Sequence, residues 1–450
     1  MKRIIIGGTK SGCGKTTVTC AILSALKRRS IEVSAFKCGP DYIDPMFHRK
    51  VIGVPSHNLD SFFCDRDTIL YLLDEYGSGS EISVIEGVMG FYDGEKGSAY
   101  SVSELTETSA VIVIDCKGMS DSIGAVMSGF LNYRSNRIAG FIFDRLSVKL
   151  IPLAKRFCDE LGTKYYGCLP KSDITIESRH LGLVTANEIS DIRSKLDKLG
   201  ELAEQYIEID KLLETEYAEF PHYNAPNLPY FSDAPTIAVA NDNAFCFIYS
   251  ENIELLKKMG CRIEYFSPLK DSNIPKADGL LLYGGYPELY AQELSANTKM
   301  LASVKKCISN GIPTLAECGG FMYLHDTLTD KDGVAYTMAG VIKGGAFPTS
   351  RLQRFGYITM NTDYNNMLCK AGESIAAHEF HYWDSTNCGN AFNAEKTDGR
   401  AWKCCHISDN LYAGFPHIYF YSNVKIAERF IRKCIEYGEK NGKSKRNSSN

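Results

Sequence analysis

Short apolar runs alternate with longer amphipathic stretches along the first half of the chain. The longer stretches, such as residues 16–28, carry apolar positions at helical spacing. The short runs cover residues 3–7, 32–36, 83–86, 111–115 and 138–143. Continuous apolar runs are typical of parallel strands that are buried on both faces, with helices as crossovers between them. The pattern predicts a doubly wound α/β domain over residues 1–214.

The pattern changes over residues 215–235, where four prolines stand among aromatic residues and asparagines. Proline lacks a backbone N–H and fixes its own φ, so this stretch is a poor helix or central strand and is expected to be a linker. A second alternating series then predicts another doubly wound α/β domain over residues 236–438. Its expected elements are strands at 236–240, 262–266, 279–283 and 314–316 and a helix at 251–259. The polar tail, residues 439–450, is expected to be disordered.

The composition argues against several classes of partner. The chain has 450 residues, 44% of them hydrophobic and 23% charged, and 50 basic against 54 acidic residues give a net charge of -4. This balance gives no reason to expect a nucleic acid or a membrane surface as partner, and no run is apolar for long enough to span a bilayer. Sixteen cysteines are scattered along the chain. We interpret them as free thiols in a reducing, cytoplasmic compartment.

The first predicted strand leads directly into a glycine-rich loop and then a helix. Residues 8–17 read Gly-Thr-Lys-Ser-Gly-Cys-Gly-Lys-Thr-Thr. Small residues let backbone N–H groups curl around phosphate oxygens, and the helix N-terminus adds partial positive charge. The loop matches a deviant P-loop, because Thr9 replaces the usual first glycine and a second lysine precedes the core. The predicted ATP-binding residues are Lys10, Gly12, Gly14, Lys15, Thr16 and Thr17.

Carboxylates follow two other predicted strands. Glu86 ends the run 83–86, where a carboxylate beside a P-loop usually anchors Mg²⁺ or positions a water. Asp41 and Asp44 lie in a loop stiffened by two prolines, at the edge where open α/β sheets bind their ligands. From the residues alone, this aspartate pair fits a functional role and a local role in satisfying turn N–H groups equally well.

A cysteine in the second half stands at a predicted strand-to-helix turn, within residues 313–324. Such a nucleophile elbow exposes one side chain, here Cys318, at a helix N-terminus whose dipole is expected to lower the pKa of the thiol. Cysteine acyl transfer also needs a base, and we predict His417, on a late apolar run. Gly284 and Gly285 are predicted to supply the oxyanion N–H groups.

Other interpretations of these residues stay open. His378 and His381 are rival bases, and their His-x-x-His spacing also raises metal binding, although no cluster of further ligands supports it. A cysteine packed only for structure is the alternative to the nucleophile. The presence of a candidate base in the same predicted domain favours the nucleophile.

These segments together resemble the cobyrinic acid a,c-diamide synthase family along nearly the whole chain. In the first half the resemblance rests on the segments GTKSGCGKTT, FKCGPDYIDP, NLDSFF, VIEGVMGFYDG and ESRHLGLV. In the second half they are AVANDNAFCFIY, FSPLKD, YGGYPELY, AECGGFMYL, RFGYITM, HEFHYWDS and the strand with His417. FKCGPDYIDP and AECGGFMYL are long and specific, and a chance match of all segments in one order is not credible.

The resemblance implies a class I-like glutaminase joined to a P-loop amidoligase domain akin to dethiobiotin synthetase. Its implied substrates are L-glutamine, ATP and cobyrinic acid, whose c and then a carboxylates are phosphorylated before ammonia displaces phosphate. Cys318 would form the glutamyl thioester with His417 as its base. Asp41 and Asp44 would lie where the acyl phosphate forms.

The resemblance also implies ligand contacts. Lys15 and Thr16 would hold ATP and Mg²⁺, with Glu86 a further contact to metal or phosphate. Basic residues are needed for the many carboxylates of the corrinoid. The candidates by resemblance are Arg179, His180 and Arg354.

Two positions depart from the family pattern. Class I glutaminases usually complete a triad with a glutamate two residues after the histidine, but Tyr419 stands there, which suggests a dyad. Asp144 replaces the asparagine of an Asn-Arg pair, which leaves the preference for a nucleotide base open.

Several alternatives share part of this pattern. Ni-sirohydrochlorin and hydrogenobyrinic acid are rival macrocycles for the same chemistry. A P-loop switch ATPase is a rival from another class, but it predicts a chain that ends near residue 230 and no thiol site. A binding protein with an inactive glutaminase is a third alternative. The oligomeric state stays open, with a homodimer as one option.

Overall fold

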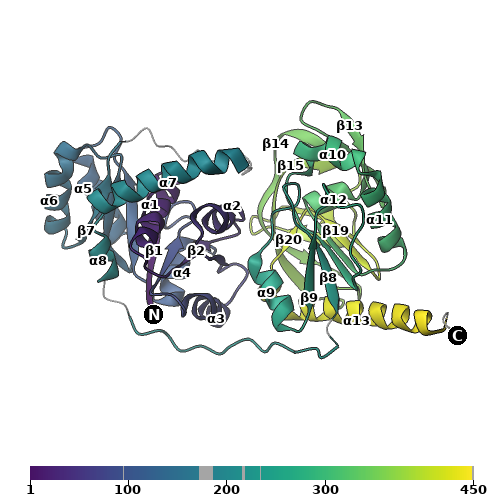
Figure 1. Cartoon of the computed structure of the whole chain (residues 1–450). Coiled ribbons are helices and arrows are strands. Elements are labelled where there is room, and N and C mark those ends of the chain that lie inside the picture. Colours follow the sequence, from purple (N-terminus) through teal and green to yellow (C-terminus); the bar gives the residue numbers. More distant parts are fainter. Residues whose placement is uncertain (95, 172–185, 215–217, 234, 448–450) are drawn as a thin grey trace. The chain divides into compact units, whose positions relative to one another are not determined.

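The computed structural model describes residues 1–94, 96–171, 186–214, 218–233 and 235–447. It divides into two compact units, Met1–Pro226 and Asn227–Asn450 (Figure 1). The division falls within the stretch expected to be a linker, residues 215–235, and the described part of that stretch forms no helix or strand.

The first unit is built on a seven-stranded sheet in which every pairing is parallel, in the order β3-β2-β4-β1-β5-β6-β7. Its strands are β1 (Lys2–Gly8), β2 (Val33–Cys38), β3 (Ser56–Leu59), β4 (Ile82–Glu86), β5 (Ala110–Asp115), β6 (Ile138–Asp144) and β7 (Lys164–Leu169). The predicted parallel sheet is confirmed. Its central strands are buried along nearly their whole length, which explains their continuous apolar sequences.

Helices pack against this sheet. They are α1 (Lys15–Arg28), α2 (Ile43–Phe47), α3 (Arg66–Gly77), α4 (Ala99–Thr106), α5 (Ser122–Asn132), α6 (Ile151–Glu160), α7 (Ala186–Tyr206) and α8 (Ile209–Leu213). The buried face of α1 shares one hydrophobic core with the central strands and with Leu196, Leu199 and Ala203 of α7 (Figure 1). This packing fixes the start of α1 at the carboxyl end of β1, where the glycine-rich loop lies.

The second unit contains a six-stranded sheet in the order β18-β19-β11-β10-β8-β9. Its strands are β8 (Thr236–Ala240), β9 (Arg262–Phe266), β10 (Gly279–Leu282), β11 (Thr314–Glu317), β18 (His406–Ile407) and β19 (Leu411–Gly414). All pairings are parallel except that of the short edge strand β18. The helices of this unit are α9 (Ser250–Lys258), α10 (Ala291–Ala296), α11 (Thr298–Ser309), α12 (Gly319–Tyr323) and α13 (Val424–Asn447). The expected second α/β domain is therefore present.

A second, largely antiparallel sheet in this unit was not predicted. It contains β12 (His325–Thr329), β13 (Ala335–Thr337), β14 (Ile342–Asn361), β15 (Ser374–Ser385), β16 (Phe392–Glu395), β17 (Ala401–Cys404) and β20 (His417–Ile418). The long strand β14 mixes buried, half-buried and exposed positions without strict alternation. Such a strand carries a weak period-two signal, so the hydrophobic pattern did not reveal it.

The end of the chain also differs from expectation. Helix α13 continues to Asn447, so most of the segment expected to be a disordered tail is helical. Lysine, arginine and glutamate are good helix formers, and they extend a helix whose earlier turns are anchored by buried Ile426, Phe430 and Ile431. Among the described helices, none has the length and apolarity needed to cross a membrane. The sixteen cysteines are free thiols.

Candidate functional site

The phosphate-binding centre begins where β1 passes into α1. Gly12 and Gly14 have φ angles of 72° and 95°, a region that glycine enters without a steric penalty. A side chain at Gly14 would begin 2.2 Å from a carboxylate oxygen of Asp144. The loop therefore needs glycine there both for its backbone turn and for the close approach of β6.

Two lysines frame the loop. The amine of Lys15 is largely buried and donates to the backbone carbonyls of Lys10, at 3.2 Å, and Met89. Burial lowers its pKa. The Lys10 side chain is 66% exposed, and its amine lies 3.8 Å from Asp115. Lys15 thus spans the loop at the start of α1, as a phosphate-binding lysine would, while Lys10 lies at its exposed rim.

A buried polar cluster lies at the ends of β2 and β4. Thr16 donates from its hydroxyl to Glu86 Oε1 at 2.6 Å, and the Lys37 amine contacts the same oxygen at 2.9 Å. The other Glu86 oxygen lies 3.4 Å from His48 Nε2. Glu86 is completely buried, so it is not merely a solvated residue at the end of a strand. Thr16 and Glu86 are thus held together beside the glycine-rich loop.

The aspartate pair takes two different environments. Asp41 accepts from the backbone N–H groups of Ile43 and Asp44, so it does satisfy the local turn. Asp44 instead forms an ion pair with Lys37 at 2.6 Å. Asp41 also reaches the Lys37 amine, but at 3.9 Å, so Asp44 is the aspartate held closely against the cluster that contains Glu86.

The charges of this cluster depend on one another. Burial acts to lower the pKa of Lys37, but the carboxylates of Asp44 and Glu86 outweigh it and raise that pKa well above its ordinary value. Burial acts to raise the pKa of Glu86, yet Lys37 and His48 hold it below its usual range. An ammonium and a carboxylate are therefore both maintained in a buried site.

The residues fit a magnesium ion that is bound together with phosphates. No group of three or more His, Cys, Asp or Glu side chains in the described residues could hold a metal by itself. Mg²⁺ commonly takes one or two protein oxygens and completes its coordination with phosphate and water. The adjacent Thr16 hydroxyl and Glu86 carboxylate offer that donor set.

The thiol centre is formed where β11 passes into α12. Cys318 stands between them with φ 48° and ψ -104°, a strained conformation for a residue with a side chain. Its N–H donates to the carbonyl of Gly414 at 2.8 Å, which ties the turn to β19. The predicted nucleophile elbow is present, because the strand, the strained turn and the helix follow one another as expected.

Gly284 brings the predicted partners together. A side chain there would begin 3.4 Å from Cys318 Cβ, 3.4 Å from His417 Nε2 and 2.6 Å from His417 Cε1. The backbone nitrogen of Gly285 lies 3.0 Å from the point where a Gly319 side chain would begin. Cys318, His417 and the two glycines predicted as oxyanion donors thus meet in one buried centre.

The expectation of a lowered thiol pKa was wrong. Burial raises the pKa of Cys318 well above its ordinary value, and the nearby carboxyl of Glu288 adds to that shift. The Gly319 N–H opposes it but is outweighed. A five-residue helix provides too weak a field to compensate for complete burial of a thiolate. The resting thiol is protonated, so it needs a base.

The rival histidines have other environments. His378 lies opposite His417 in the β15–β20 pairing, and burial, followed by the neighbouring His417, lowers its pKa to about 3. His381 stacks on Phe415 with ring centroids 3.9 Å apart and contacts Glu379 at 3.2 Å. A base that protonates only near pH 3 is a poor proton acceptor at neutral pH, which favours His417 over His378.

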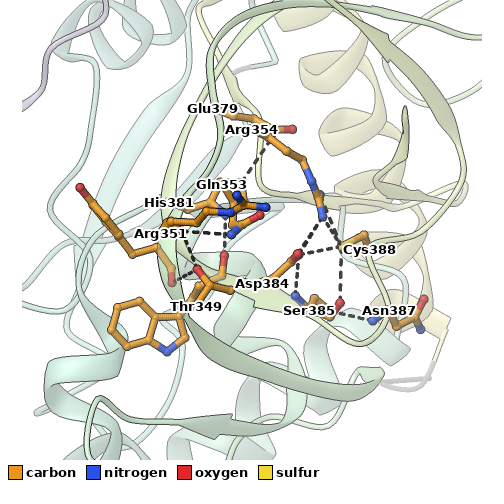
Figure 2. A network of polar contacts seen from close by, with 12 residues as sticks. Thr349, Arg351, Gln353, Arg354, Glu379, His381, Asp384, Ser385, Asn387 and Cys388 are labelled. Carbon is orange, nitrogen blue, oxygen red and sulfur yellow. Dashed lines mark hydrogen bonds and ion pairs between the residues drawn. The ribbon is translucent and has the colours of Figure 1, made fainter. Parts of the chain in front are cut away.

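The candidates for corrinoid binding have different outcomes. Arg179 and His180 lie outside the described residues. Figure 2 shows Arg354 turned toward Asp384 and Cys388, and its guanidinium lies 2.8 Å from the carboxylate and 3.6 Å from the sulfur. Arg354 also has φ 43°, which is uncommon for a non-glycine residue. A substrate carboxylate at Arg354 would have to share it with Asp384.

Two residues of these centres, Lys37 and Glu317, were not predicted from the sequence. Lys37 was detectable in principle, because it is the single charged residue in the buried strand β2. Glu317, next to Cys318, places its Oε2 3.5 Å from His417 Nδ1. No spacing rule signals that contact, because β11 and β20 belong to two different sheets and meet only in the folded unit.

Comparison with known proteins covers both units. A family described as CobQ/CobB/MinD/ParA nucleotide binding domain matches residues 4–184, and one described as CobB/CobQ-like glutamine amidotransferase domain matches residues 236–424. A cobyrinate a,c-diamide synthase of Thermoplasma volcanium is 37% identical over 97% of this chain and 98% of its own length. The chain belongs to the cobyrinate a,c-diamide synthase family.

Other members of the cobyrinate a,c-diamide synthase family match at similar levels. That of Fusobacterium nucleatum is 38% identical over 95% of this chain and 99% of its own length. That of Picrophilus torridus is 37% identical over 96% and 98%, respectively. Because each match spans both units, the glycine-rich loop and the nucleophile elbow belong to one family architecture.

A methyl group at Gly284 is expected to impair the thiol centre of this family member. In Gly284→Ala the new Cβ would clash with His417 Cε1, so the imidazole must move, and a displacement of about 1 Å can cost about 10²-fold in rate. Glutamate release from glutamine measures the effect. Gly129→Ala, in α5 with open space around it, serves as the control. Undiminished hydrolysis in Gly284→Ala would refute this placement of His417.

Proposed function

We propose that this chain amidates the a and c carboxylates of cobyrinic acid, with ATP as the activating substrate and glutamine as the nitrogen donor. The observation that carries the proposal is the match to a cobyrinate a,c-diamide synthase along 97% of the chain, in a structure that contains both the thiol centre and the phosphate-binding centre. The reaction belongs to cobalamin biosynthesis. The free cysteines support a reducing, cytoplasmic setting.

The thiol centre would release ammonia from glutamine. The Cys318 sulfur attacks the side-chain amide carbon while His417 takes the thiol proton and returns it to the leaving nitrogen. N–H groups of Gly284 and Gly285 stabilise the oxyanion that forms on the carbonyl oxygen. Water then hydrolyses the glutamyl thioester. The raised thiol pKa supports this sequence, because the proton must be removed during the attack.

The phosphate-binding centre would activate the carboxylate. Loop N–H groups around Gly12 and Gly14, with Lys15 and Thr17, bind the phosphates of ATP, and Lys10 adds charge at the rim. A carboxylate oxygen of the corrinoid attacks the γ-phosphorus and ADP leaves. Ammonia then attacks the acyl carbon of the acyl phosphate and phosphate leaves. The c carboxylate reacts before the a carboxylate.

Acidic residues and a metal complete that centre in the proposal. Asp41, in the loop after β2, and Asp44, in the first turn of α2, would face the acyl phosphate, and Asp44 fixes the Lys37 ammonium there. Thr16 and Glu86 would hold Mg²⁺, which when bound neutralises charge on the phosphates. In the structure Lys37 holds the same Glu86 oxygen, so this ammonium keeps the carboxylate oriented toward Thr16.

The structure counts against some of the alternative functions and leaves others open. The second unit, with Cys318 beside Gly284, counts against a P-loop switch ATPase. The same geometry counts against an inactive glutaminase. Ni-sirohydrochlorin and hydrogenobyrinic acid stay as alternative macrocycles. A homodimer also stays a prediction, which sedimentation velocity would test.

The purified chain is expected to release phosphate from ATP when Mg²⁺, glutamine and cobyrinic acid are all present. Mass spectrometry should detect a product with two new amides. Parallel reactions with Ni-sirohydrochlorin and hydrogenobyrinic acid test the macrocycle. Turnover with only one of these would keep the mechanism and change the substrate, whereas no macrocycle-stimulated turnover would contradict the proposed function.

A further inference from the structure

The base of the thiol centre has a buried carboxylate on its far side. His417 Nδ1 lies 3.5 Å from Glu317 Oε2, and both residues are about 1% exposed. His417 Nε2 lies near Cys318, since both approach the position where a Gly284 side chain would begin. The imidazole of His417 therefore lies between the thiol of Cys318 and the carboxylate of Glu317, the residue that precedes Cys318.

Glu317 is fixed by a second contact. Its Oε1 accepts the backbone N–H of Ile418 at 3.2 Å, and Ile418 follows His417 in β20. One carboxylate oxygen is thus anchored to the strand that carries the histidine, and the other faces the imidazole. Burial raises the pKa of Glu317, while the neighbouring His417 and the Ile418 N–H oppose that rise.

We propose that Glu317 is the positioning carboxylate of the thiol centre and takes the place of the absent glutamate after His417. It orients the imidazole with Nδ1–H toward itself, so that Nε2 carries no proton and can accept the one from the thiol, and it stabilises the imidazolium that forms. This inference rests on the proposed glutaminase function. The centre is then a triad whose nucleophile and acid are adjacent in sequence.

The tautomer of His417 makes the proposal testable. In Glu317→Gln the Ile418 N–H still requires the amide oxygen, so the amide NH₂ faces Nδ1. An NH₂ donor at Nδ1 forces the proton onto Nε2, where it blocks acceptance of the thiol proton. A wrong tautomer of this kind lowers the rate of a nucleophilic triad strongly. We expect kcat for glutamine hydrolysis to fall by about 10²- to 10⁴-fold with little change in KM.

The pH profile separates this role from a structural one. The titratable groups around His417 are Glu317, Cys318 and His378, and Glu288 and Glu379 act on the Cys318 thiol. His378, with a pKa of about 3, stays neutral across the measured range. Loss of the carboxylate charge removes stabilisation of the imidazolium. The acid limb of kcat/KM should therefore move to lower pH in Glu317→Gln.

Two further variants complete the test. Glu317→Asp keeps the charge and should recover at least about tenfold of the lost rate, within the range attributed to general base catalysis. Tyr419→Phe, at the position where the family acid usually stands, should keep the wild-type rate and profile. Alkylation of Cys318 by iodoacetamide at neutral pH should slow only in the Glu317 variants.

The outcomes are distinct. Glu317→Gln with wild-type kcat and an unmoved acid limb would overturn the proposal, as would an equal loss of ammonia-dependent synthesis, which indicates a structural role. If glutamine hydrolysis were lost in Tyr419→Phe but kept in Glu317→Gln, the positioning role would belong to Tyr419. A wild-type protein that neither hydrolyses glutamine nor reacts with iodoacetamide at Cys318 would contradict the proposed function itself.

Discussion

Replacement of Lys15 by alanine is expected to slow amide synthesis severely with either glutamine or free ammonia as the nitrogen source. The Lys15 amine donates to the carbonyls of Lys10 and Met89. It therefore lies beside the glycine-rich loop, where it would contact the β- and γ-phosphates of ATP. Removal of one preorganised positive charge that contacts the transferring phosphoryl group costs about 10²- to 10³-fold in rate. Phosphate release with ammonia as the nitrogen source measures this step without the thiol centre.

The controls separate charge from geometry. Lys15→Arg keeps the charge but offers a planar fork in place of a compact ammonium, so it should restore little activity. Lys198→Ala, on the exposed side of α7, should behave as wild type. Basal glutamine hydrolysis should survive in Lys15→Ala, because its thiol centre belongs to the other unit. If Lys15→Ala kept ammonia-dependent synthesis at the wild-type rate, the glycine-rich loop would have no role in activating the carboxylate.

The sequence predicted those parts of the fold in which one strong signal dominates. Strand β8 was placed to the residue, because an apolar run bounded by turns leaves little ambiguity. Strand β9 was also placed to the residue, although it is a mixed and mostly exposed segment. The antiparallel sheet around β14 was missed, since its half-buried strand has no clean period. The helical end of α13 was missed because a polar segment was judged by its lack of buried surface and not by helix propensity.

The same distinction holds at the centres. Cys318 and Lys15 stand in motifs whose local geometry is fixed by neighbouring glycines, and the structure places them as expected. Interactions that cross between strands were not predictable. The contact of Lys37 with Glu86 depends on the register of β2 and β4, and that of Glu317 with His417 depends on how strands of two different sheets approach each other. The pKa of Cys318 depends on burial, which no motif specifies.

Removal of the thiol is expected to separate the two halves of the reaction. Cys318→Ala cannot form the glutamyl thioester, so glutamine-dependent synthesis should fall by about 10³-fold or more. Synthesis from added ammonia should continue at the wild-type rate, because Lys15 and Glu86 lie in the other unit. Parallel assays with glutamine and with ammonium chloride, both followed by product mass, measure the two values.

Two variants guard this test against a folding artefact. Cys307→Ala removes another thiol of the same unit, half-buried on α11, and should retain both activities. Cys318→Gly also lacks the thiol, but glycine adopts φ 48° without the strain of a side chain, so it should melt no lower than Cys318→Ala. If both Cys318 variants lose glutamine use and keep ammonia use, the loss is chemical. Glutamine-dependent synthesis that survived in either variant would show that another group attacks the amide, and the thiol assignment would be wrong.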